Sequence, residues 1–168
     1  MGTTSLVEQF LAGVGQGVGV LRGRCVSYGG GITFWPVVQL LRQAAGLVGE
    51  ESAAATEKAL LAVLDTAPDR VAVVERLLSL LGLGGEPGSA EETFWAVRAV
   101  LEHLAGRGPL VVVVDDLHWA EPTLLELLER LRDEAGGVPR LIVAPARPGW
   151  LEAAPGGGGG GVAGSAVP

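Results

Sequence analysis

Two adjacent carboxylates follow the most apolar run of the chain and offer the clearest chemistry. Asp115 and Asp116 come directly after LVVVV at 110–114. Ligands of open α/β sheets gather at the carboxyl ends of strands, where two acids can hold Mg²⁺ and orient a water. Because successive strand residues point to opposite faces, we expect the first to bind Mg²⁺ through water and the second to polarise the attacking water. The alternative is that both aspartates simply end a strand and cap the next segment of the chain.

The other reactive side chains carry weaker signals. Cys25 is the single cysteine, which excludes an intramolecular disulfide, and it ends an apolar stretch, which favours a buried, inert thiol. Two histidines are too few for a histidine-rich metal site. We expect His118 to pack or hydrogen-bond after the strand, and His103 to be solvated in its helix. Metal-dependent hydrolysis by the two aspartates and His118 would need further ligands that the sequence does not announce.

No complete phosphate-binding loop is visible in the sequence. G-x-x-x-x-G-K-[ST] requires a lysine after a glycine loop, and the only lysine, Lys58, lies in a helical stretch without one. The glycines of GVGQGVG at 13–19 follow an expected helix and precede an expected strand, whereas a dinucleotide fingerprint follows a strand and opens a helix. Neither segment therefore predicts a nucleotide site by itself.

The elements that must position the two carboxylates are strands buried on both faces and helices that cover them. An all-apolar strand is typical of a parallel sheet with helices on both sides. The sequence predicts an α/β fold in three layers, with a helical insert between the first two visible strands. Strands are expected at 18–25, 110–114 and 140–145, and helices at 4–12, 35–45, 52–65, 69–82, 90–105 and 122–131.

Composition limits the class of protein. The 168 residues are 48% hydrophobic, which is enough for one domain with a core. The net charge of −7 argues against direct nucleic-acid binding, which requires a basic patch. No signal peptide and no apolar run near the roughly 18 residues of a membrane span are visible. We expect a soluble cytoplasmic protein without membrane contact.

Four segments together resemble a known family. The run DDLHWAEPTLLELL looks like the Walker B region of STAND-type AAA ATPase domains, which occur in large bacterial regulators and adenylate/guanylate cyclase-like proteins. RGRCVSYGGGITFWPV resembles the strand and turn after the first helix of these domains. EETFWAVRAVLEHLAGRGPL resembles the helix before Walker B, and LIVAPARPGWLE the fourth strand with its arginine. The resemblance covers residues 2–155 in the family's order.

The resemblance implies roles for five residues and two cofactors, ATP and Mg²⁺. Asp115 matches the Mg²⁺-binding acid and Asp116 the acid that activates water. Arg147 lies where the family places an arginine that senses the terminal phosphate. Thr4 lies where the family has the Mg²⁺-binding hydroxyl, and Thr3 stands where its lysine belongs.

The departure from the family leads to the functional expectation. The glycine loop and the first strand of the family are missing, and that strand would lie beside 140–145. We therefore expect only part of a P-loop NTPase-like fold, which is inactive as an ATPase on its own. We expect a partial ATPase domain at 1–154 and a flexible glycine-rich tail at 155–168. The parent would be an ATP-dependent regulatory switch with an effector domain, a cyclase or a DNA-binding module, and oligomers are compatible with it. The alternative is a non-catalytic interaction module.

Overall fold

Three parallel strands form the centre of the protein. The computed structural model describes residues 2–27, 33–134, 137 and 139–145. Within these, β1 (Gly19–Arg24), β2 (Leu110–Asp115) and β3 (Arg140–Val143) lie in the order β1-β2-β3. Both strand pairs are parallel. The expected α/β sheet of three neighbouring parallel strands is confirmed, while the expected tail at 155–168 and Arg147 lie outside the described residues.

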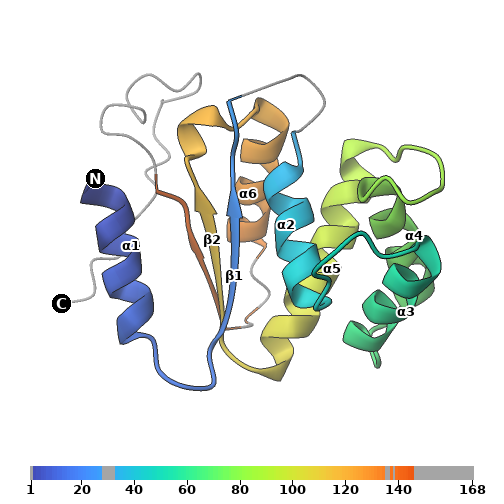
Figure 1. Ribbon diagram of the computed structural model, residues 1–168, viewed down its shortest axis with the longest axis horizontal. Helices are drawn as coiled ribbons and strands as arrows, with labels where there is room; N and C mark the ends of the chain where they lie inside the picture. Colours follow the sequence, from blue (N-terminus) through green and yellow to red (C-terminus); the bar gives the residue numbers. More distant parts are fainter. Residues whose placement is uncertain (1, 28–32, 135–136, 138, 146–168) are drawn as a thin grey trace.

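Helices cover both faces of this sheet (Figure 1). α1 lies on one face, and α2, α5 and α6 lie on the other. α4 packs farther out against α5, and α3 packs against α4, so the helical insert between β1 and β2 adds to the second helical side. The helices are α1 (Gly2–Gly13), α2 (Trp35–Ala44), α3 (Ala53–Val63), α4 (Arg70–Leu80), α5 (Ala90–Arg107) and α6 (Pro122–Asp133), with a short 3₁₀ helix η1 (Leu117–Trp119) after β2.

The central strand β2 is buried along its whole length. Because strand side chains alternate, Val111 and Val113 pack against Val7 of α1. Leu110, Val112 and Val114 belong to the larger core with the helices of the other face. This two-sided burial explains why the strand has no polar residue before Asp115.

Local sequence signals fix several helix starts. Ser89 accepts a hydrogen bond from the backbone N–H of Glu92, whose carboxylate accepts one from the Ser89 N–H, so α5 begins with a capping box. Proline occupies the first turn of α2 (Pro36) and of α6 (Pro122), where its missing N–H costs no helical bond.

The outer edge of β1 is covered by two glutamines of α2. The Gln43 side chain accepts from the Arg22 backbone N–H at 2.9 Å and donates to the Arg22 carbonyl at 2.5 Å. Oε1 of Gln39 accepts from the Arg24 N–H at 2.7 Å. α2 can approach β1 this closely because residue 23 is glycine, since a Cβ there would lie 2.4 Å from the carbonyl oxygen of Pro36. Side chains of α2 thus take the place of a neighbouring strand at Arg22 and Arg24.

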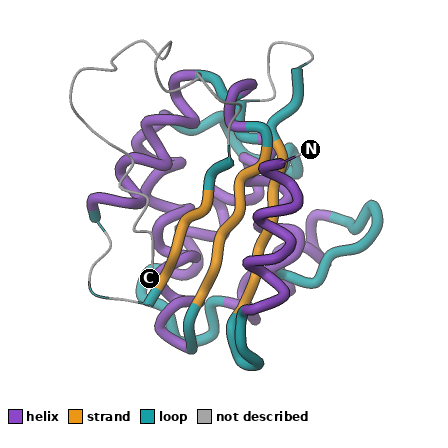
Figure 2. Tube along the Cα trace, turned by 90° about the vertical axis from the view of Figure 1, so that its left-hand side faces the viewer, coloured by secondary structure: helices purple, strands orange, loops and turns teal. Residues whose placement is uncertain are grey.

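The other edge strand, β3, is more open. Figure 2 shows α1 in front of the sheet on the β1 side. Ile142 of β3 packs into the larger core, but no described strand pairs with the outer side of β3. Leu141 of β3 is 47% exposed. A strand edge with an exposed leucine is a surface on which a further strand can pair.

One side-chain expectation differs from the structure. Lys58 lies on α3, in the helical stretch expected for it, and is exposed. The expectation that His103 is solvated is wrong: its side chain is only 14% exposed, and Nε2 lies 3.2 Å from the Asp65 carboxylate. The loop before α4 carries Asp65 onto α5, a contact between distant segments that helical periodicity does not report. No described helix is long and apolar enough to cross a membrane.

Candidate functional site

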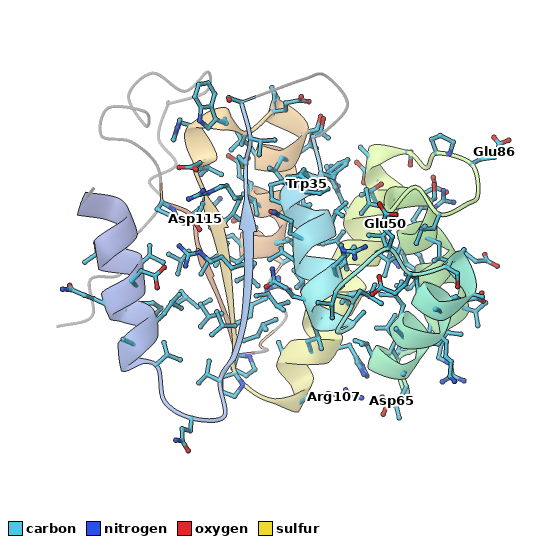
Figure 3. All side chains as sticks on the ribbon, in the orientation of Figure 1. Trp35, Glu50, Asp65, Glu86, Arg107 and Asp115 are labelled. Carbon is cyan, nitrogen blue, oxygen red and sulfur yellow. The ribbon has the colours of Figure 1, made fainter. Side chains whose placement is uncertain are left out.

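Asp115 lies at the carboxyl edge of the sheet, on the face that α1 covers. It is the last residue of β2 and is buried. Its carbonyl accepts a hydrogen bond from the Cys25 N–H at 2.9 Å, so the ladder with β1 continues to the end of both strands. Figure 3 shows Asp115 between α1 and the strands. α1 also begins at this edge of the sheet (Figure 1), so the helix start and the acid lie at one end of the molecule.

A guanidinium joins Asp115 to α1. Nε of Arg22 donates to Oδ2 of Asp115 at 2.5 Å, and Nη1 of Arg22 bonds to the Glu8 carboxylate. The Asp115 side chain is only 9% exposed and that of Arg22 is 32% exposed. The hydrogen bond to Asp115, followed by that to Glu8, raises the pKa of Arg22 above its ordinary value. One cation therefore bridges two acids from two elements.

Asp116 leaves the strand in a left-handed conformation, with φ 56° and ψ 43°. Aspartate tolerates this region better than most residues. Its carboxylate lies 3.1 Å from Nε of Arg24, and both side chains are more exposed, at 41% and 59%. Arg22 and Arg24 are two residues apart in β1, so both point to the same face of the strand. Both aspartates therefore contact arginines of that one face. The expectation that strand alternation sends the two carboxylates to opposite faces is therefore wrong, since Asp116 is no longer in the strand.

The neighbouring groups are buried and weakly reactive. Burial, with smaller contributions from Asp116 and Asp115, raises the pKa of the Cys25 thiol to about 11, in agreement with the inert cysteine predicted from the sequence. The His118 ring packs against Trp119, with ring centroids 5.1 Å apart. Neither ring nitrogen of His118 has a hydrogen-bond partner among the described residues, in which the ring packs rather than hydrogen-bonds.

The structure brings together only part of the predicted site. Asp115 and Asp116 lie side by side, whereas Arg147 lies outside the described residues. Thr3 and Thr4 lie in the first turn of α1 by their backbone, and their side chains are not described. The sequence reasoning missed the arginine partners. Their signal was the pair of charges at alternate positions of GVLRGR, which places two cations on one face of the strand.

The donor chemistry at this edge suits Mg²⁺ only with help from a bound ligand. A carboxylate is a hard oxygen donor, and Mg²⁺ is commonly held by one or two carboxylates together with waters and phosphates. Asp115 is the residue that would hold the ion. In the described part of the chain, no three His, Cys, Asp or Glu side chains cluster closely enough to form an all-protein site. Substrate phosphates would have to complete the coordination.

A hollow between the other ends of the strands does not provide a second site of this kind. It is lined mainly by glycine and apolar side chains, including Gly17, Gly19 and Leu110. Its charged group, Arg107, lies 2.6 Å from the Asp65 carboxylate and is already paired (Figure 3). The carboxyl edge remains the best candidate.

Comparison with known proteins bears on the family of the chain, not on the roles of single residues. The sequence profile of the AAA ATPase domain family matches residues 1–143. An uncharacterized protein of Rhizobium meliloti (strain 1021) is 36% identical over 95 residues, which are 49% of this chain and 9% of that protein. The match thus spans a small part of that relative, and no solved structure matches the chain. Because the profile match covers most of its length, the chain belongs to the AAA ATPase domain family.

Proposed function

We infer that this chain supplies the acidic half of an Mg²⁺–ATP site in a STAND-type signalling ATPase. The parent protein acts as an ATP-dependent switch coupled to an effector, a cyclase or a DNA-binding module. The observation that carries this proposal is the buried Asp115 at the end of an all-apolar parallel strand, followed by Asp116 in a left-handed turn. Acids at this position of an α/β sheet face the crevice where ligands bind.

Each acid has its own role in the proposal. The buried Asp115 holds the metal, and the more exposed Asp116 orients the attacking water. Thr4 supplies a hydroxyl to the metal from the start of α1, and Arg147 contacts the terminal phosphate. When bound, Mg²⁺ neutralises phosphate charge. The G-x-x-x-x-G-K segment that cradles the phosphates is not within these 168 residues, so they do not hydrolyse ATP alone.

A second candidate is a non-catalytic interaction module with an NTPase-like fold. Two observations favour it. Both acids are already paired with arginines of β1, Asp115 with Arg22 and Asp116 with Arg24. In addition, β3 has an uncovered edge with Leu141 exposed, which a partner strand can extend by β-augmentation.

The test restores the missing half of the site and asks whether the acids respond. A strand and a G-x-x-x-x loop are joined in front of Gly2, and Thr3→Lys gives G-K-T at 2–4. Titration calorimetry then measures ATP binding with and without Mg²⁺. The 168-residue chain without the addition is the baseline, for which we expect no measurable binding.

The matched variants separate the two candidates. In the restored chain, Asp115→Asn weakens Mg²⁺–ATP binding about tenfold or more, because the metal loses its protein ligand. Asp116→Asn keeps binding and lowers phosphate release by about 100-fold or more. Asp133→Asn changes neither, since Asp133 is an exposed aspartate whose partner among the described residues is its neighbour Arg132. No ATP binding by the restored chain, or binding that is indifferent to Asp115 and to Mg²⁺, supports the interaction module.

A further inference from the structure

The helices on the side of the sheet away from α1 leave a groove between α5 and α6. Its cavity of about 240 Å³ has an apolar floor formed by the buried side chains of Phe94, Leu127 and Leu131. One wall is Trp95, the largest apolar side chain of α5, which is nevertheless 44% exposed. Pockets that hold small-molecule ligands measure about 300–1,000 Å³, so this cavity suits one large apolar side chain better than a nucleotide.

Arg130 of α6 lies over the floor of this groove. Its guanidinium carbon is 5.0 Å from the centre of the Phe94 ring. Its terminal nitrogens donate to both oxygens of Glu91 at 2.7 and 2.8 Å, and Nη2 also donates to Glu126 at 3.0 Å. The hydrogen bonds from Arg130 hold the pKa of Glu91 below its ordinary value, so this carboxylate is ionised at neutral pH. The guanidinium is therefore engaged by two acids and a ring.

Arg98 of α5 bridges the two helices in a similar way. Its Nε donates to Glu102 on the same helix at 2.7 Å. Its Nη1 donates to Glu134, the residue directly after α6. All three side chains are partly exposed. Each arginine of the groove is thus engaged by two carboxylates.

The rim of the groove carries an excess of negative charge. Four glutamates surround two arginines, which leaves two negative charges unbalanced. Glu102, Glu126 and Glu134 each use one oxygen in these contacts, so the other oxygen can accept from a partner. Both arginines are already engaged, so this rim does not attract an acidic partner. A second copy of this chain, with its net charge of −7, would also bring like charge.

We propose that the groove between α5 and α6 docks a basic amphipathic helix of a partner protein. One large apolar side chain of that helix packs against Trp95, and its lysines or arginines lie on the glutamates of the rim. An apolar anchor in a pocket surrounded by polar groups is typical of a binding hot spot. A helix suits the groove because positions one turn apart reach the floor and the rim together. The inference goes beyond the proposed function, since neither Asp115 nor Asp116 lines this groove.

The test measures binding of fluorescein-labelled peptides to the 168-residue chain by fluorescence anisotropy. One peptide carries leucines at i, i+3, i+4 and i+7 and lysines at the other positions, so that its leucines share one helical face. A second peptide has the same composition with the leucines spread around the helix. The first should bind about tenfold more tightly, because only it presents an anchor with flanking charges. No binding of the first peptide, or equal binding of the two, overturns the proposal.

A pair of tryptophan variants locates the binding. Trp95→Ala removes the wall of the groove and should weaken binding of the first peptide about tenfold. The matched control is Trp119→Ala, which removes a tryptophan of similar exposure, 47%, outside the groove. It should stay within about twofold of wild type. Both side chains are substantially exposed, so neither variant removes a buried core residue. Equal binding by Trp95→Ala and wild type overturns the proposal.

A pair of charge variants separates the rim from the general acidity of the chain. Changing both Glu126 and Glu134 to glutamine should weaken binding about fivefold at about 50 mM salt, and less at about 500 mM salt, where exposed charges are screened. The matched control changes both Glu57 and Glu75 to glutamine, two exposed acids of α3 and α4. It lowers the negative charge of the chain equally and should stay within about twofold of wild type. An equal loss in the two double variants overturns the proposal, because it would mean that the peptide binds the overall charge and not the groove.

Discussion

Replacing Gly23 by alanine tests whether the backbone of α2 packs directly against the backbone of β1, with no side chain between them. The added Cβ would lie 2.4 Å from the Pro36 carbonyl oxygen and 2.9 Å from its carbonyl carbon and Cα. These are backbone atoms in the first turn of α2, so no side chain can rotate to make room. The helix has to move away from the strand by about 1 Å to reach ordinary van der Waals contact.

The cost has two parts. Overpacking of a closely packed contact costs about 1–3 kcal/mol. The same movement lengthens the bonds from Gln43 to Arg22 and from Gln39 to Arg24, and each lost hydrogen bond contributes about 1 kcal/mol. We expect Gly23→Ala to lower the free energy of unfolding by about 3 kcal/mol, with partial relaxation limiting the sum.

Urea denaturation followed by circular dichroism measures this change. The matched control is Gly106→Ala in α5, where a Cβ meets nothing within 4 Å and where alanine is the better helix former. That variant should be unchanged or more stable by up to about 1 kcal/mol. A Gly23→Ala protein within about 0.5 kcal/mol of wild type would refute the reasoning, because it would mean that α2 does not rest on β1 as closely as described.

Two further predictions concern ionisation and helix capping. Because the pKa of Cys25 is about 11 in the folded chain, above its ordinary 9.0, the native state keeps the proton longer than the unfolded state. The free energy of unfolding should therefore fall as pH rises from 9.0 towards 11, with no such fall in Cys25→Ala; urea denaturation at several pH values measures it. Ser89→Ala should lower stability by about 1 kcal/mol and Ser89→Gly by a few tenths, because glycine is a better N-cap than alanine. Thermal melts of the two variants would contradict the capping argument if they were equally destabilised.

The elements of this fold could be predicted because their signals are local. The apolar run before Asp115 indicates a strand buried on both faces, and the structure buries all of it. The Ser89 capping box and the early prolines of α2 and α6 mark helix starts within one turn. Each signal depends on residues within about four positions of one another, which is the range that periodicity and capping report.

The partners of the two acids could not be predicted because they are set by strand register. Arg22 and Asp115 are 93 residues apart, and a helical insert separates them. They meet because Arg22 pairs with Val113 in the ladder and Asp115 with Arg24, two positions along on the same face. The left-handed turn at Asp116 then brings the second acid to Arg24. Composition shows that arginines are present, but only the register decides which acid each one meets.

The two edges of the sheet differ in a way that limits where a further strand can attach. At β1 the backbone groups of Arg22 and Arg24 bond to Gln43 and Gln39, so a strand cannot add there without displacing α2. At β3 no described strand pairs with the outer side, and Leu141 is exposed. A parallel strand added beside β3 would end two strand spacings, about 10 Å, from the end of β2. Its following loop would then reach the same carboxyl edge as Asp115 and the start of α1. The same open edge would serve a partner strand of another protein equally well, and the response of Asp115 to a restored loop distinguishes the two.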